Sequence, residues 1–73
     1  MSKKLEFWIF SKDTGQLHSE VYQDSRFPDG SFITTSPVVK IDDGIVTTQS
    51  GTNYVLGKSY ISSVKDIEEY LSR

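Results

Sequence analysis

The triplet Asp13-Thr14-Gly15 is the first place in the chain where residue type and spacing match a known catalytic motif. Aspartic proteases pair two such carboxylates across two lobes or a dimer, each after an apolar strand. Here Lys12 precedes the aspartate, and 73 residues are few even for a dimeric protease. The same residue types are common in turns, since glycine adopts positive φ without steric cost. We therefore predict a turn at this triplet.

The single histidine, His18, raises the question of a nucleophile–histidine–acid arrangement with a serine and Asp24. No glycine pattern of a nucleophile elbow accompanies it, so we expect His18 on the solvent side of a strand. One histidine without cysteine cannot fill a zinc site. Asp42 and Asp43, with Asp29, lack the spacing of an EF-hand calcium loop and are typical of turns. The sequence therefore predicts a non-enzymatic protein with no catalytic residue, metal or cofactor; a small hydrolase is the third hypothesis.

Composition and charge indicate a small protein whose fold depends on apolar packing. The formal net charge is −2, with acidic and basic residues mixed, so no general attraction to nucleic acid or anionic lipid is expected. The absence of cysteine suits a reducing compartment. The N-terminal segment fits neither a signal peptide nor a membrane span. We expect a single domain over residues 1–73, in the cytoplasm, with a core built from aliphatic and aromatic side chains.

Two alternating segments near the N-terminus predict a β-hairpin. Leu5 to Ser11 would place Trp8 and Phe10 on the side opposite Leu5. After a glycine turn, Leu17 to Tyr22 resumes the alternation. Because the first segment carries bulky apolar groups on both sides, it is either covered on both faces or presents an exposed aromatic patch.

The segment from Val38 to Gly57 reads as three strands joined by two glycine turns. We predict a three-residue loop at Asp42–Gly44 and a two-residue turn at Ser50–Gly51. One face then forms core and the other is mixed. The core face collects Val39, Ile41, Ile45, Tyr54 and Leu56, and the other keeps Val38, Lys40, Val46, Thr48, Asn53 and Val55. A two-residue turn at Asp43–Gly44 would shift this register, and the pattern leaves that alternative open.

The remaining segments complete the expected fold. Ser31 to Ile41 is extended, and Pro37 within it marks a bulge, an edge position or a break between two short strands. Ser62 to Leu71 has helical spacing, with Ser62 or Ser63 as the N-cap. We predict an α+β, mainly β domain: about five strands in a curled antiparallel sheet or small SH3-like barrel, with one C-terminal helix packed against it.

Exposed aromatic side chains are the best candidates for a binding function. Trp and Tyr are frequent anchors of protein interfaces, so Trp8, Phe10 and Tyr22 are our predicted partner-binding residues, with Asp42 and Asp43 as an acidic rim. An edge strand or the aromatic face could also join two copies in a homodimer. The alternative is a small β-barrel that stacks single-stranded nucleic acid on these aromatics. It is less favoured because the basic residues are scattered.

Two stretches carry a resemblance that covers under half of the chain: Arg26 to Val39, with its Phe-Pro-Asp-Gly and Thr-Ser-Pro-Val-Val sequences, and Ile45 to Gly57, with Thr-Gln-Ser-Gly-Thr-Asn-Tyr-Val-Leu-Gly. The chain resembles small uncharacterised bacterial and prophage β-rich proteins that share these turns and strands. The resemblance implies a compact β domain and carries over no catalytic residue. It also implies a prophage or mobile-element setting, in which an inhibitor or accessory role is an expectation.

Overall fold

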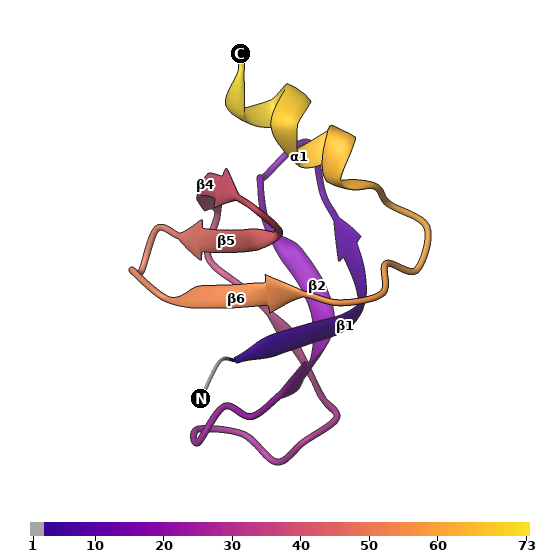
Figure 1. The fold of residues 1–73 in the computed structure, drawn as a ribbon, viewed down its shortest axis with the longest axis vertical. Helices are drawn as coiled ribbons and strands as arrows, with labels where there is room; N and C mark the ends of the chain where they lie inside the picture. The colour runs from indigo at the N-terminus through magenta and orange to yellow at the C-terminus, as the bar shows by residue number, and fades with distance from the viewer. Residues whose placement is uncertain (1–2) are drawn as a thin grey trace.

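The computed structural model describes residues 3–73 as six strands and one helix (Figure 1). Met1 and Ser2, part of the segment for which no signal peptide is predicted, lie outside the described residues. The mainly β fold with one C-terminal helix is confirmed. In chain order the elements are β1 (Lys4–Phe10), β2 (Leu17–Tyr22), β3 (Ser31–Thr34), β4 (Val38–Asp42), β5 (Ile45–Thr48), β6 (Asn53–Leu56) and α1 (Val64–Leu71).

All six strands form one mixed sheet in the order β3-β2-β1-β6-β5-β4, which corrects the expectation of about five antiparallel strands. β1 and β6 are parallel, while the other neighbours are antiparallel. Pro37 lies in the break between β3 and β4, where its missing N–H prevents the strand from continuing. β3 and β4 are the two edge strands and do not pair with each other, so the sheet does not close into the expected SH3-like barrel.

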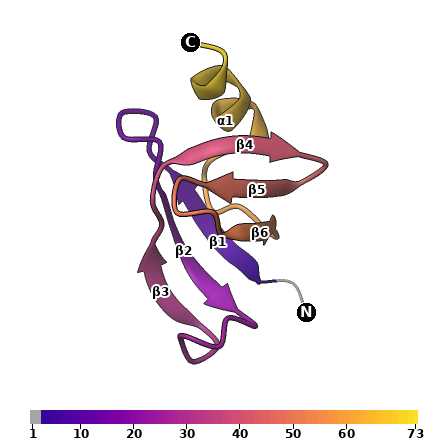
Figure 2. The ribbon, with the colours of Figure 1, turned by 90° about the vertical axis from the view of Figure 1, so that its left-hand side faces the viewer.

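The sheet is strongly curled, so that β4, β5 and β6 run across β1, β2 and β3 (Figure 2). Hydrogen bonds between distant segments hold the curl. The Val38 N–H donates to the Gly15 carbonyl at 2.7 Å, which ties the start of β4 to the β1–β2 turn. The Ser50 N–H donates to the Ser36 hydroxyl at 3.1 Å, which ties the β5–β6 loop to the β3–β4 connection. Ser36 therefore has a structural role through its bond to Ser50.

A bulge in β1 changes the predicted faces of that strand. Glu6 pairs with Glu20 and Ile9 pairs with His18, so three steps along β1 match two along β2. Phe7 takes up the extra residue with a φ of 53°, a rare conformation for a bulky side chain. Alternation resumes one residue out of phase after the bulge, which puts the side chains beyond it on the side opposite to the prediction.

The two C-terminal hairpins have their loop lengths exchanged relative to the prediction. Asp42 pairs with Ile45, which leaves Asp43–Gly44 as a two-residue turn with positive φ at both positions. The β5–β6 connection is a three-residue loop, because the Thr48 N–H donates to the Thr52 carbonyl. A one-residue slip turns every side chain to the other face. Thus Val46 and Thr48 of β5 are buried and Ile45 is exposed, contrary to the predicted core. A bulge at Val39 also leaves Val38 buried and Val39 exposed. Tyr54 is buried, and Ile41 and Leu56 are partly buried against the core, as predicted.

The core fills the concavity of the curled sheet, and α1 covers one end of it beside β4 (Figures 1 and 2). Ser63, one of the two predicted caps, begins the helix, and its N–H donates to the Asp66 carboxylate at 3.1 Å. From α1, Ile67 is completely buried, and the Tyr70 ring meets Phe10 edge-on at 5.5 Å between centroids. The buried apolar residues are Leu5, Trp8, Phe10, Leu17, Val21, Val38, Val46, Tyr54 and Ile67.

Candidate binding surface

The convex face of β1, β2 and β3 carries side chains that the core does not use. In β2, Leu17, Ser19 and Val21 are buried, so the alternate residues His18, Glu20 and Tyr22 point outward. On this face Ile9 is paired with His18, and Glu20 lies directly opposite Phe32. The convex face therefore mixes apolar side chains with an acidic one.

Three aromatic side chains gather around one shallow depression on this face. We call Phe7, Ile9, Phe32 and Tyr60, with Glu20 among them, the aromatic patch; these five residues line a space of about 400 Å³. The exposed fraction is 45% for Phe7 and 66% for both Phe32 and Tyr60. Exposed aromatic residues that cluster from separate elements are characteristic of an interaction surface.

Backbone bonds fix the patch members that come from irregular segments. The Phe7 N–H donates to the Lys58 carbonyl at 2.6 Å, and this bond holds the strained residue of the β1 bulge. The Tyr60 N–H donates to the Trp8 carbonyl at 3.0 Å, next to a bridge between Trp8 and Ser59. The segment before α1 is thus bound along β1, and its aromatic ring is held at the surface.

Phe32 also lies at an open edge of the sheet, because β3 has no partner on its outer side within the described chain. The Thr35 N–H donates to the Leu17 carbonyl at 2.9 Å. In an antiparallel ladder, backbone groups of successive residues point alternately toward and away from the neighbouring strand. The N–H and C=O groups of Phe32 and Thr34 therefore point away from β2. The side chain of Phe32 therefore belongs to the aromatic patch, while its backbone N–H and C=O lie at the open edge of the sheet.

Glu20 has a defined hydrogen bond within the convex face. The Tyr22 hydroxyl donates to its Oε1 at 2.7 Å, and this bond to a carboxylate raises the pKa of Tyr22. Glu6, paired with Glu20 across β1 and β2, is in contrast neutralised by Lys4 at 3.2 Å. The Lys58 N–H and the Lys4 ammonium together lower the pKa of Glu6. Tyr22, a predicted anchor, thus lies on the convex face but supports Glu20.

Trp8 and Phe10 are core residues, which corrects their prediction as partner-binding anchors. Trp8 is 2% exposed, and its indole N–H donates to the Gly57 carbonyl at 3.1 Å. Phe10 is 6% exposed and lies against Tyr70. The bulge at Phe7 is the reason: it turns both rings inward and leaves the ring of Phe7 outside. No signal in the alternation marks this bulge, so sequence reasoning chose the wrong aromatics of β1.

The predicted acidic rim does not join the aromatic patch. Asp42 and Asp43 lie at the β4–β5 turn, at the end of the sheet opposite β3. Neither of them lines the depression of the aromatic patch. Asp43 adopts a φ of 52°, so its place in the sequence is explained by the turn.

The residues considered for catalysis lie apart. The His18 Nδ1 is 2.9 Å from the Thr34 hydroxyl on the convex face. Asp24 is buried elsewhere, where it accepts two hydrogen bonds from the Arg26 guanidinium. These bonds hold the pKa of Asp24 at about 2. Asp24, considered as the acid of a triad with His18, is therefore engaged in an ion pair with Arg26. Arg26 also donates a hydrogen bond to the Tyr54 hydroxyl.

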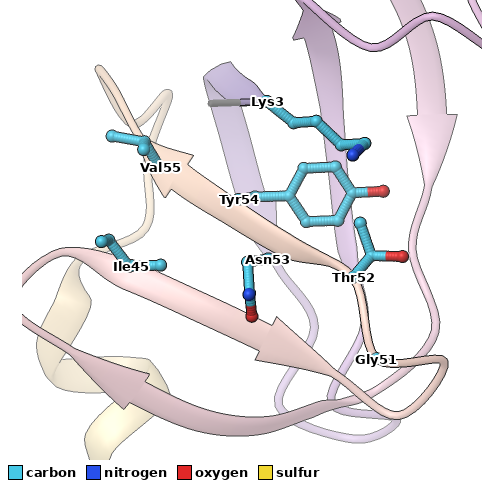
Figure 3. A pocket seen from close by; sticks show the side chains of 7 residues that line it. All are labelled: Lys3, Ile45, Gly51, Thr52, Asn53, Tyr54 and Val55. Carbon is cyan, nitrogen blue, oxygen red and sulfur yellow. The ribbon is translucent and has the colours of Figure 1, made fainter. Parts of the chain in front are cut away.

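A second depression, of about 510 Å³, lies beside β6 (Figure 3). Figure 3 shows the Lys3 side chain above the Tyr54 ring, with its amine directed to the same side as the hydroxyls of Tyr54 and Thr52. Ile45, Gly51, Asn53 and Val55 complete the lining. Apart from the tyrosine ring, these walls offer no aromatic anchor, so the aromatic patch is the stronger candidate site.

Within residues 3–73, no three His, Cys, Asp or Glu side chains come close enough together to hold a metal ion. The helix that the structure describes is too short and too polar to cross a membrane. Comparison of the chain with protein-family models, with curated proteins and with solved structures found no match.

Proposed function

We propose that the protein is a non-enzymatic binding module that recognises an extended segment of a partner protein through the aromatic patch and the edge of β3. The observation that carries the proposal is the exposure of Phe7, Phe32 and Tyr60 around one depression. Aromatic anchors with flanking polar groups supply most of the binding free energy at protein interfaces. No chemical step is required of such a site.

A polypeptide is favoured as the partner because the patch is continuous with an open strand edge. A strand added beside β3 would bond to the N–H and C=O groups of Phe32 and Thr34, and alternate side chains of the added strand would meet the patch. A second copy of this chain could use the same edge, since β3 is able to pair antiparallel with itself. β3 has only four residues, so side-chain contacts must add affinity to the backbone bonds.

Single-stranded nucleic acid is the less well supported partner. Bases could stack on the exposed rings, but the carboxylate of Glu20, which has no cationic partner among the described residues, lines the same depression. Carboxylates next to the stacking rings repel phosphates, whereas nucleic-acid sites of this type lie in positively charged grooves. An inhibitor or accessory role in a prophage or mobile element suits the proposed module, because such a role requires a binding surface alone.

The test compares three forms of the protein, immobilised at equal density and exposed to host lysate. They are the wild type, the double variant Phe32→Ala/Tyr60→Ala and the control Ile61→Ala. Ile61 is 77% exposed and adjoins Tyr60 in the chain, but it does not line the depression. The expected result is a protein retained by the wild type and the control and lost, by at least about tenfold in affinity, from the double variant.

Retention of the same protein by all three forms would refute the proposed site. Retention of a labelled oligonucleotide by the wild type, with loss at raised salt, would instead favour the nucleic-acid alternative. Sedimentation velocity on the same three forms distinguishes self-association from binding to another protein. Pairing of two copies through β3 would make the wild type and the control dimeric.

A further inference from the structure

We propose that the aromatic patch takes an arginine side chain of the bound polypeptide, held by Glu20 and the surrounding rings. This inference rests on the proposed function and specifies the chemistry that its partner must offer. The starting observation is that a carboxylate lines the same depression as Phe7, Phe32 and Tyr60. Three aromatic rings beside one carboxylate provide both kinds of contact that a cation seeks.

The carboxylate of Glu20 has acceptor capacity that the protein does not use. Its Oε1 accepts the Tyr22 hydroxyl, while within residues 3–73 no lysine or arginine lies within ion-pair distance of it. Glu6 faces it across the ladder, and two like charges directly opposite each other destabilise a sheet. Lys4 compensates Glu6 only. A cation supplied by a partner would complete the charge balance at Glu20.

The rings around Glu20 strengthen the case for a cation over a neutral donor. Phe32 lies directly opposite Glu20 in the β2–β3 ladder, at a position where the two residues do not exchange backbone bonds. Side chains at such positions are the closest pairs in an antiparallel sheet. A group bonded to the carboxylate therefore lies against the Phe32 ring. A cation over an aromatic face gains further attraction, whereas a neutral donor does not.

Arginine fits this arrangement better than lysine. Its guanidinium is planar, stacks on aromatic rings and donates two parallel hydrogen bonds to a carboxylate. An ammonium is a compact, strongly hydrated charge that cannot stack. A polypeptide can supply this arginine, because a strand paired with the edge of β3 presents its side chains over the convex face.

The test uses blocked pentapeptides made of strand-forming residues with a central arginine, citrulline, lysine or trimethyllysine. Binding is followed by the chemical shifts of backbone amides in ¹H–¹⁵N NMR spectra at low ionic strength. The arginine peptide is expected to shift the amides of Glu20, Phe32 and Tyr60 with a Kd of about 1 mM or tighter. Citrulline has nearly the same shape without the charge, and its peptide should bind about tenfold more weakly.

The variant Glu20→Gln keeps an acceptor for the Tyr22 hydroxyl and should lose the preference for arginine over citrulline. Glu69→Gln, the same change at an exposed position of α1, should keep it. Equal binding of the arginine and citrulline peptides, no shift at these amides with the arginine peptide, or an unchanged preference in Glu20→Gln would each overturn the inference. So would a stronger response to lysine or trimethyllysine, which would assign the site to another cation.

The same variant separates this inference from the proposed function. If Glu20→Gln retains the lysate partner that Phe32→Ala/Tyr60→Ala loses, the aromatic patch is the binding site and the arginine assignment fails. If the double variant also retains that partner, the proposed function fails and the inference fails with it.

Discussion

Replacing Trp8 with alanine should remove a large part of the stability of the fold. The indole is 2% exposed, and truncation of such a side chain costs about 3–5 kcal/mol. The lost bond from the indole N–H to the Gly57 carbonyl adds about 1 kcal/mol. A chain of 73 residues has a total unfolding free energy of roughly 4–11 kcal/mol. At the lower end of that range the variant would be largely unfolded at room temperature.

Phe32→Ala is the matched control, because it removes an aromatic ring from the convex face. Complete burial of a phenylalanine is worth about 1.5–3 kcal/mol, and the ring of Phe32 is 66% exposed. Its removal should therefore cost roughly 0.5–1 kcal/mol. Trp8→Phe keeps a ring in the core but no indole N–H, so its cost should fall between those of the two alanine variants.

Urea denaturation followed by far-ultraviolet circular dichroism measures all three variants without relying on tryptophan fluorescence. With a slope of about 1 kcal/mol per molar urea, as for small proteins, Trp8→Ala should lower the midpoint by about 3 M or more. Phe32→Ala should lower it by less than about 1 M. A Trp8→Ala cost below about 1 kcal/mol, or equal costs for the two alanine variants, would refute the conclusion that the β1 bulge places Trp8 in the core.

Two further predictions concern a glycine and the ion pair between buried Asp24 and half-exposed Arg26. Gly15→Ala should destabilise by more than about 2 kcal/mol, because its φ is +76° and an added Cβ would overlap the Tyr70 ring; Gly44→Ala, with φ +77° and open space, should cost about 1 kcal/mol. Equal costs in urea denaturation would contradict the contact with Tyr70. The pKa of Asp24 lies at about 2, below its ordinary value of 3.8, so its ionised form stabilises the fold above pH 4 and this contribution is lost as the pH falls toward 2. The loss should be on the order of 1–2 kcal/mol, because Arg26 is half exposed, and Asp24→Asn should remove it from the pH dependence of stability; an unchanged pH profile in that variant would contradict the assignment.

Turn chemistry explains why much of the fold was predictable. Gly15, Gly30, Gly44 and Gly51 all adopt positive φ, and each lies in a connection between two strands. Ser63 begins the helix as predicted, and Pro37 separates two short strands. These features depend on local conformational preferences, which a residue carries wherever it lies in the fold.

The loop lengths could not be read from the same glycines. Asp43–Gly44 and Ser50–Gly51 each allow a two-residue or a three-residue loop, and the two choices differ only in which face is buried. The flanking strands carry apolar side chains on both faces, so burial pattern did not decide between them. The choice was made by packing against the other half of the curled sheet, where Val46 and Tyr54 meet the core.

The sequence predicted an aromatic binding surface but not the residues that form the candidate site. Trp8, Phe10 and Tyr22 were predicted as aromatic anchors, but the aromatic patch consists of Phe7, Phe32 and Tyr60 with Ile9 and Glu20. Of the predicted anchors, only Tyr22 lies on the convex face, where it bonds to Glu20. Phe32 lay in a recognised extended segment, and its exposure follows from the edge position of β3. Tyr60 comes from a segment without regular structure, so no periodicity could place it.

From the sequence alone came the turns, the strand segments, the helix and its cap, because each depends on the conformational energy of a few neighbouring residues. Tertiary structure alone decided which rings of β1 are buried, since that depends on a bulge at Phe7 held by a carbonyl 51 residues away, at Lys58. A single extra residue in β1 reversed the strand's faces. Trp8 consequently stabilises the core, and the aromatic patch beside Glu20 is left open to a partner.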